Sequence, residues 1–253
     1  MAVAVDGSTP ARWAAAVAVL GGTATSASFT APTDALLIAC VNADGADDTE
    51  GGTVAFSDSG GLTWTTRVMR GYSETAAGGY SGIFTARTTS SVARTATVTR
   101  NGGIGAAKRF SVKLYVLTGV DVDGTPVDTV GASNEGGSAT NNLTTSSITP
   151  GANGLLVCAD TDWNALGAYA ASSDLTQDTA HYTGEISVCS GYKTCTSGVG
   201  VTGNLNAAGT SAAQHKWCQV TVRESAVAAQ DTPELYGRKG LSPARQIQQL
   251  LSW

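Results

Sequence analysis

Residues 29–40, FTAPTDALLIAC, return as residues 148–159, ITPGANGLLVCA, and this repetition organises the chain. In each copy a Thr precedes a proline-containing turn, and an apolar run of β-forming residues follows the turn. Such runs, bounded by turn residues, are typical of strands that are buried on both faces. Residues 80–83 are further matched with residues 182–186, and residues 108–116 with residues 214–222. The sequence therefore predicts a weak internal duplication of one β-rich half.

The composition fits many short strands joined by tight turns. The 253 residues include 31 Gly, and only 14% of them are charged. A β-sandwich of this length often remains a single domain. We predict an all-β fold, a jelly-roll-like antiparallel β-sandwich over residues 13–225, built from halves at residues 27–119 and 146–225. Residues 1–12 are expected to form an irregular arm.

Charge and hydropathy exclude two classes of partner. A net charge of −5 and a pI near 4.9 argue against nucleic acid, which requires a basic surface. No apolar stretch has the length of a membrane span, and no signal peptide is recognised, so we expect translation into the cytoplasm without membrane insertion. Cys40, Cys158 and Cys218 lie in apolar runs and are predicted to be reduced and buried, the first two at matching positions of the repeat.

The last residues differ in pattern from the rest. Residues 226–253 are predicted to form an extended strap followed by a short amphipathic α-helix, with Ser242 as N-cap and Pro243 in the first turn. A helix this short is not stable alone in water and needs a groove. Its apolar side is predicted to bind a partner subunit through Leu241, Ile247, Leu250, Leu251 and Trp253. The alternative is that the helix folds back onto its own sandwich.

One short motif, residues 57–64 (SDSGGLTW), resembles the Asp box of sialidases, with Ser59 where that family has its Asp. In that family the box is a structural turn. The residues themselves predict a hairpin, because Gly60 and Gly61 permit positive φ and Ser57 and Asp58 can accept from backbone amides. Trp64 would then return into the core.

Metal-binding patterns are weak. Acidic loops offer oxygen ligands at alternate positions, as calcium requires, but none has the bidentate Glu of an EF-hand loop. The weak calcium candidates are Asp44, Asp47, Asp121, Asp123, Asp160 and Asp162. His215 and Cys218, with Cys189 and Cys195, have the ligand types for zinc but not the spacing. Cys189 and Cys195 could instead bracket and cross-link a hairpin loop. No cofactor is expected.

Enzyme motifs are also lacking, and we expect no catalytic activity. The histidines are His181 and His215, and the sequence has no nucleophile elbow or metalloprotease signature. Two carboxylates suffice for a glycosidase, so Asp160, Asp162 and Glu185 are the candidate catalytic carboxylates of that alternative. Aromatic rings in or beside predicted loops could stack on sugars or pack between strands. These candidates for glycan contact are Trp163, Tyr169, Tyr182 and Tyr192.

Together, the duplicated turn and strand, the residue 57–64 turn, residues 116–121 (VLTGVD) with residues 126–128 (PVD), and residues 237–251 (GRKGLSPARQIQQLL) resemble a known family. They are similar to minor tail and decoration-type virion proteins of tailed bacteriophages that infect high-GC Gram-positive hosts. The resemblance implies a structural protein, assembled in the host cytoplasm and displayed on the virion. Its partners would be other virion subunits, copies of itself and, as an added role, host-surface glycan.

The sequence therefore supports three hypotheses of function. The leading one is a minor tail protein that acts by subunit assembly, with a capsid decoration or head-fibre protein as its variant. A carbohydrate-binding module is the rival from another class. A tail-associated glycan hydrolase is the third.

Overall fold

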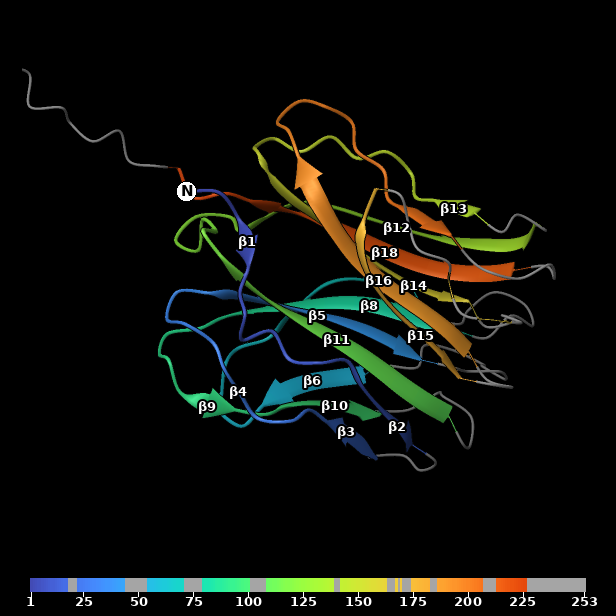
Figure 1. Ribbon diagram of the computed structural model, residues 1–253, viewed down its shortest axis with the longest axis horizontal. Helices are drawn as coiled ribbons and strands as arrows, with labels where there is room; N and C mark the ends of the chain where they lie inside the picture. The colour runs from blue at the N-terminus through green and yellow to red at the C-terminus, as the bar shows by residue number, and fades with distance from the viewer. Residues whose placement is uncertain are drawn as a thin grey trace, which may run out of the picture.

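The computed structural model describes residues 1–17, 22–43, 54–70, 79–100, 108–138, 142–162, 167, 169, 174–182, 186–206 and 213–226. This part of the chain consists of antiparallel strands and turns and contains no helix (Figure 1). The all-β prediction is confirmed. Residues 227–253, which include the predicted C-terminal helix and Trp253, lie outside the described residues.

The first half of the described chain forms a large and a small sheet. The large sheet has the order β1-β11-β5-β8-β7, with β2 also paired to β11, and the small sheet has the order β3-β10-β6. A separate ribbon pairs β4 with β9. The strands are β1 (Ala4–Val5), β2 (Trp13–Val17), β3 (Thr23–Thr25), β4 (Phe29–Thr30), β5 (Leu36–Ala43), β6 (Val54–Asp58), β7 (Thr65–Arg70), β8 (Tyr80–Arg87), β9 (Ala93–Arg94), β10 (Ala96–Arg100) and β11 (Lys108–Thr118).

The second half repeats this plan with fewer strands. Its large sheet has the order β12-β18-β14-β16-β15, and its small sheet pairs β13 with β17. The strands are β12 (Val127–Ser138), β13 (Asn142–Thr144), β14 (Gly154–Asp162), β15 (Thr176–Tyr182), β16 (Ile186–Cys195), β17 (Asn204–Asn206) and β18 (Ala213–Arg223). The polar segment of residues 131–147 therefore supplies part of the edge strand β12 together with β13.

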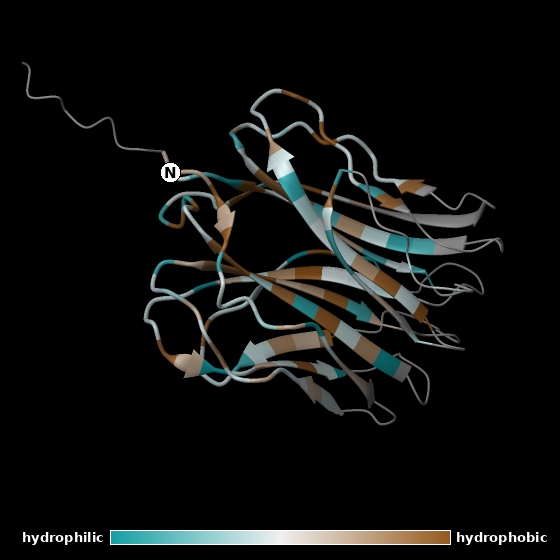
Figure 2. Ribbon diagram, viewed as in Figure 1, coloured by the Kyte–Doolittle hydropathy of each residue, from teal (hydrophilic) through white to brown (hydrophobic). Residues whose placement is uncertain are grey.

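The four sheets are stacked in layers, with the two large sheets in the middle (Figure 1). Alternate residues of β5 explain this packing, because Leu37 faces the first small sheet while Ile38 faces the second half. The central core takes residues from both halves, among them Ile38, Tyr115, Val157 and Val220. Every residue of β5 is buried, which agrees with a strand covered on both faces, and apolar residues occupy much of the central strands (Figure 2). The domain boundaries themselves stay a prediction.

Strand pairing is nested in both halves. In the first half β2 pairs with β11, β3 with β10, β4 with β9, and β5 with β8. In the second half β12 pairs with β18, β13 with β17, and β14 with β16. Each half thus wraps as one long antiparallel ribbon folded on itself. β7 and β15 are added at corresponding edges, beside β8 and β16.

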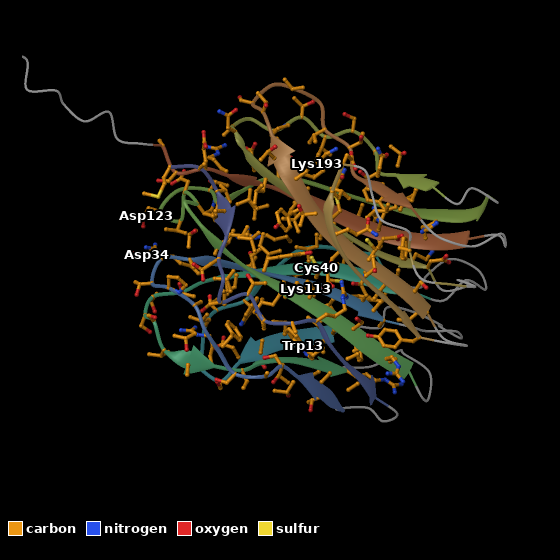
Figure 3. All side chains as sticks on the ribbon, viewed as in Figure 1. Trp13, Asp34, Cys40, Lys113, Asp123 and Lys193 are labelled. Carbon is orange, nitrogen blue, oxygen red and sulfur yellow. The ribbon has the colours of Figure 1, made fainter. Side chains whose placement is uncertain are left out.

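The strand register shows which residues of the two copies are equivalent. Leu36 pairs with Leu117 and Arg87, and Leu155 pairs with Val222 and Thr194. Cys40 therefore corresponds to Ala159, and not to Cys158 as predicted. Cys40 faces the central core (Figure 3). Cys158 faces the outer core of the second half, which lies between the large and the small sheet of that half. A shift of one residue moves a side chain to the opposite face of a strand.

Two other matches of the repeat are also displaced. Phe110 and His215 are equivalent, because they pair with Ala43 and Asp162 at the ends of β5 and β14. The predicted match of residues 108–116 with residues 214–222 is therefore wrong by one residue. Residues 80–83 lie within β8, but residues 182–186 span the end of β15 and the start of β16, so that match is wrong.

Residues 1–12 are more ordered than the predicted irregular arm. Ala4 pairs with Thr118 through β1, and the backbone nitrogen of Met1 donates to the carbonyl of Ser225 at 2.9 Å. Gly119 has a φ of 71°, and a Cβ there would lie 2.2 Å from the carbonyl oxygen of Ala2. The arm therefore packs closely against the ends of both halves.

Residues 57–64 form a turn that changes sheets and not the predicted hairpin. β6 pairs with β10 in the small sheet, whereas β7 pairs with β8 in the large sheet. Asp58 accepts from the amides of Gly60 and Leu62 at 2.6 and 3.0 Å, and from Trp64 Nε1 at 2.8 Å. Gly61 has the expected positive φ, 70°. Trp64 packs against the outer core of the first half, so the turn joins the two sheets around it.

Candidate functional site

The acidic calcium candidates do not meet at one place. β14 begins with Gly154 opposite Arg223 and ends with Asp162 opposite His215, and Val120 bridges to Glu224. The segment with Asp121 and Asp123 therefore lies at one end of the molecule, and Asp160 and Asp162 approach the other. In the described part of the chain no group of three His, Cys, Asp or Glu residues could hold a metal ion. Asp44 and Asp47 lie outside it.

A buried polar cluster lies near the end of β14. Asp160 Oδ2 is 2.6 Å from His215 Nδ1 and also accepts from the hydroxyl of Tyr169. Asp160 is completely buried, and His215 and Tyr169 are 3% and 5% exposed. Burial, followed by the nearby charge of Asp160, raises the pKa of Tyr169 well above its ordinary value. The cluster resembles catalytic groups in composition, but its burial makes it part of the core.

The other carboxylate and cysteine candidates give no site either. Asp162 is 3% exposed, and Glu185 lies outside the described residues. Cys189 and Cys195 are both free and lie on the continuous strand β16. Six residues of extended chain span about 20 Å, far beyond the reach of a disulfide. The predicted hairpin loop between them does not form, so their pairing is excluded.

The four aromatic candidates have different environments. Tyr169 is buried in the cluster above, and Trp163 lies outside the described residues. Tyr182 ends β15, where the guanidinium of Arg109 lies 4.6 Å from its ring centroid. Tyr192 is within β16 and not in a loop, and its ring meets Tyr115 edge to face at 5.5 Å. Tyr192 also lines a pocket.

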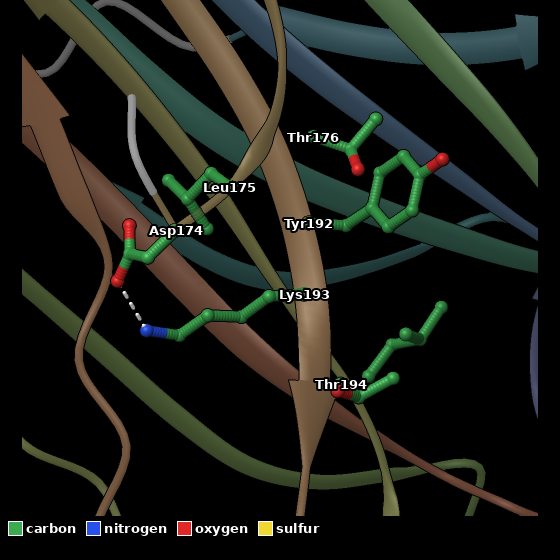
Figure 4. A pocket seen from close by; sticks show the side chains of 7 residues that line it. Asp174, Leu175, Thr176, Tyr192, Lys193 and Thr194 are labelled. Carbon is green, nitrogen blue, oxygen red and sulfur yellow. Dashed lines mark hydrogen bonds and ion pairs between the residues drawn. The ribbon is translucent and has the colours of Figure 1, made fainter. Parts of the chain in front are cut away.

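This pocket, the β16 pocket, results from a difference in strand length. β15 pairs with β16 only from Thr176 opposite Tyr192, whereas β16 continues along β14 to Cys195. A hollow of about 410 Å³ opens where β15 has not yet begun (Figure 4). Its volume is within the range of small-molecule sites. It is lined by Leu155, Asp174, Leu175, Thr176, Tyr192, Lys193 and Thr194.

An ion pair forms one side of the β16 pocket. Lys193 Nζ lies 2.6 Å from Asp174 Oδ2, and the side chains are 21% and 29% exposed (Figure 4). Asn204 Nδ2 donates to the same oxygen at 3.4 Å, and Thr144 Oγ1 donates to Asn204 Oδ1 at 2.8 Å. The second small sheet therefore holds the carboxylate in place. Tyr192, Thr176 and Thr194 lie on the other side of the β16 ribbon.

Sequence reasoning identified Tyr192 but not its neighbours. Asp174, Lys193 and Thr194 are not among the candidate residues that the sequence analysis names. The signal that could have found them is the length of the apolar and polar alternation through residues 186–195, which is that of one long strand.

Comparison with known proteins adds no assignment: no protein-family model, curated protein or solved structure matches the chain. Among the described residues there is also no helix with the length and apolar character needed to span a membrane.

Proposed function

We propose that this chain is a structural virion protein of a tailed bacteriophage, a minor tail protein that acts by assembly with other subunits and with itself. The observation that carries the proposal is the nested pairing in both halves. This nested antiparallel pairing supports a jelly-roll arrangement, and jelly rolls build viral capsid and lectin domains. The sequence resemblance to virion proteins of tailed phages supports the same assignment.

The central core supports a role as a rigid building block. Apolar residues of both large sheets form one cluster, and Arg12 joins the halves at the side. Its guanidinium donates to Ser111 of β11 at 3.0 Å and to Asp178 of β15 at 3.1 Å. Charged groups shared between halves resist sliding of one sheet past the other, because a shift would leave them unpaired. We infer that the two halves move as one unit in the particle.

A capsid decoration or head-fibre protein would use the same fold. Immunogold electron microscopy of the native particle, with antibodies against the purified chain, separates these positions. Labelling confined to the tail supports the minor tail protein, and labelling over the capsid replaces it with the variant. Particles from which the protein is absent by mass spectrometry would refute the virion proposal in both forms. Preadsorbing the antibody with purified chain provides the control.

A carbohydrate-binding module is the second candidate, and the β16 pocket favours it. The pocket is lined by the half-buried Tyr192 and, on the other side of β16, by the Lys193–Asp174 ion pair. That combination suits recognition of a polar ligand with apolar faces. Binding to a glycan array by a chain that is absent from particles would favour this alternative. The hydrolase is not favoured by an observation here, since Asp160 and Asp162 are buried.

A further inference from the structure

We propose that the outer edge of β12 is a self-association site, to which β12 of a second copy adds as an antiparallel strand. This contact would supply the assembly of the chain with itself, so the inference rests on the proposed function. Among the described residues β12 pairs with β18 alone, and its other edge has no strand beside it (Figure 1). Unpaired backbone groups at such an edge are a template for another extended chain.

The hydrogen bonds of β18 show which residues of β12 point to the open edge. The amide of Arg223 donates to the carbonyl of Pro126 at 2.9 Å, on the β12 side of β18. Backbone groups alternate between the two sides of a strand, and β18 runs along β14 without a register shift, so Gln219 also points to β12. Gly131 is opposite Gln219 and therefore bonds within its own sheet. The residues on either side of Gly131 then present their N–H and C=O groups outward.

These two residues, Val130 and Ala132, also form the apolar surface of the edge. They lie opposite Val220 and Cys218, which belong to the central core, so their side chains are on the central-core side of the sheet. Ala132 packs against that core, but Val130 is 49% exposed. Apolar surface continuous with the core thus reaches the open edge, and an added strand would cover it.

The other edge strands of the large sheets carry protection that this part of β12 lacks. β7 has a register shift after Thr66 and carries Arg67 and Arg70, and β1 and β2 have only two and five residues. β15 is bound at Asp178 by Arg12 of the N-terminal arm. Charges, irregular pairing, short length and covering segments all prevent edge strands from pairing with other chains. Residues 130–134 of β12 (VGASN) are uncharged and lie between its two register shifts.

A second copy fits this edge because the edge is complementary to itself. Two identical antiparallel strands are related by a two-fold axis, so each outward N–H meets an outward C=O of the other copy. Although the chain has a net charge of −5, residues 130–134 bring no like charges together. Asp128, earlier in β12, is ion-paired with Arg223 at 2.7 Å. A contact this short is expected to be weak in solution and to be strengthened by avidity among several copies in a particle.

The test uses the full chain in solution. Sedimentation equilibrium should show monomers and dimers with a Kd of roughly 10–100 μM. Amide hydrogen exchange, measured residue by residue at concentrations below and above that Kd, then locates the contact. Exchange at Val130 and Ala132 should slow severalfold as the dimer forms. Gly131 is bonded within its own sheet and should exchange slowly at every concentration.

Two exposed valines provide a matched pair of variants. Val130→Lys places a charge on the open edge and should raise the Kd at least tenfold. Val92 is 46% exposed in the turn before β9 of the first half, so Val92→Lys is the control and should leave the Kd unchanged. Ala132→Pro removes an outward N–H without removing a bond to β18, and it should also prevent dimerisation. If the proline variant does not fold, Val130→Lys decides.

Three results would overturn the inference. The chain stays monomeric well above the expected Kd, or Val130→Lys dimerises like the wild type, or Val130 and Ala132 exchange slowly in the monomer. The last result would mean that another part of this chain already covers the edge. Labelled particles with a monomeric chain would leave the virion role intact and refute the β12 contact, whereas a β12 dimer without particle labelling would do the reverse.

Discussion

Asn42 and Thr161 occupy the same position in the two copies of the repeat, and they are hydrogen-bonded to one another. Asn42 Nδ2 donates to Thr161 Oγ1 at 2.9 Å, and both residues are completely buried. Thr161 Oγ1 donates onward to the carbonyl of Tyr80 at 2.7 Å, and Ser81 Oγ donates to that of Ala159 at 3.2 Å. Polar groups in a dry core must stay paired, so these bonds fix how the large sheets lie on each other.

Replacement of Thr161 by Val should expose this constraint. The substitution keeps the shape of the side chain but removes the acceptor of the Asn42 amide, and we expect a loss of about 1–3 kcal/mol in the free energy of unfolding. Urea denaturation measures it. Asn42→Leu combined with Thr161→Val should cost less than the sum of the single changes, because neither partner is then left unpaired. Simple additivity would show that the two residues are not coupled.

The two halves are expected to unfold together. Separating them would expose the central core on both large sheets, including Leu36, Ile83 and Val222. Two variants, one with Trp64 and the other with Trp217 as the sole tryptophan of the five, should give one common unfolding midpoint by fluorescence. Two separate transitions would contradict the shared unit. So would release of two folded, monomeric fragments after cleavage within residues 131–142.

Much of the fold could be predicted from local sequence pattern, but the assignment of residues to faces and of strands to sheets could not. The buried strand at residues 36–43 has no polar alternation before Asn42, so the sequence identifies the strand but not which residues face which core. The two copies, aligned position by position, already place Cys40 opposite Ala159, so the false equivalence of Cys40 and Cys158 came from matching residue types and not positions. The sheet change at Asp58 was missed because turn residues specify a reversal of direction but not the sheet that the next strand joins.

Asp58 should matter more than an ordinary turn residue. Besides its three hydrogen bonds, its side chain is fully buried and lies 3.8 Å from the buried guanidinium of Arg94. Asp58→Ala removes the charge partner of Arg94 and should lower the free energy of unfolding by about 3–5 kcal/mol, as loss of one member of a buried pair does.

Ser59 is the matched control for this turn. Its hydroxyl accepts from the amide of Thr95 at 2.9 Å on an exposed part of the turn. Ser59→Ala should therefore cost no more than about 1 kcal/mol. Thermal and urea denaturation of both variants test the difference. Equal losses would mean that the Asp58 pair does not stabilise the change of sheet.

The five cysteines should be slow to react in the native protein. Burial raises the pKa of Cys40 and of Cys218 to about 12 and that of Cys195 to about 11. A raised pKa lowers the thiolate fraction at pH 8, and the thiolate is the reacting species. Iodoacetamide labelling followed by mass spectrometry should modify Cys195 first and Cys40 and Cys158 last. All five should react equally in urea, and rapid native labelling of Cys40 would contradict its place in the central core.

The candidate site was harder to foresee than the core. Tyr192 was selected as an aromatic residue beside a loop, but the β16 pocket depends on where β15 begins relative to β16. Strand length and pairing register are tertiary properties, and single-sequence patterns determine element boundaries least well. Lys193 and Asp174 are 19 residues apart and meet only because that register brings them together.

The last prediction concerns residues 227–253, whose sequence predicts an assembly peptide. Ser242 can cap a helix that Pro243 begins, and the apolar residues at 247, 250 and 251 then share one face. Near the end of the described residues, the carbonyl of Ser225 accepts from the backbone nitrogen of Met1. Truncation after Ala226 keeps that contact. We expect the shortened chain to fold with little change in thermal midpoint but to fail to join the particle.

Point variants in the full chain test the assembly role of the predicted helix without shortening the chain. Ile247→Glu with Leu250→Glu should prevent incorporation, because two charges cannot enter an apolar groove without a large desolvation cost. Gln248→Ala, on another side of the predicted helix, should be incorporated normally. Particle incorporation is measured by mass spectrometry of purified virions, and stability by thermal denaturation of the isolated chain. A large fall in the midpoint of the truncated monomer would show instead that the helix docks on its own sandwich.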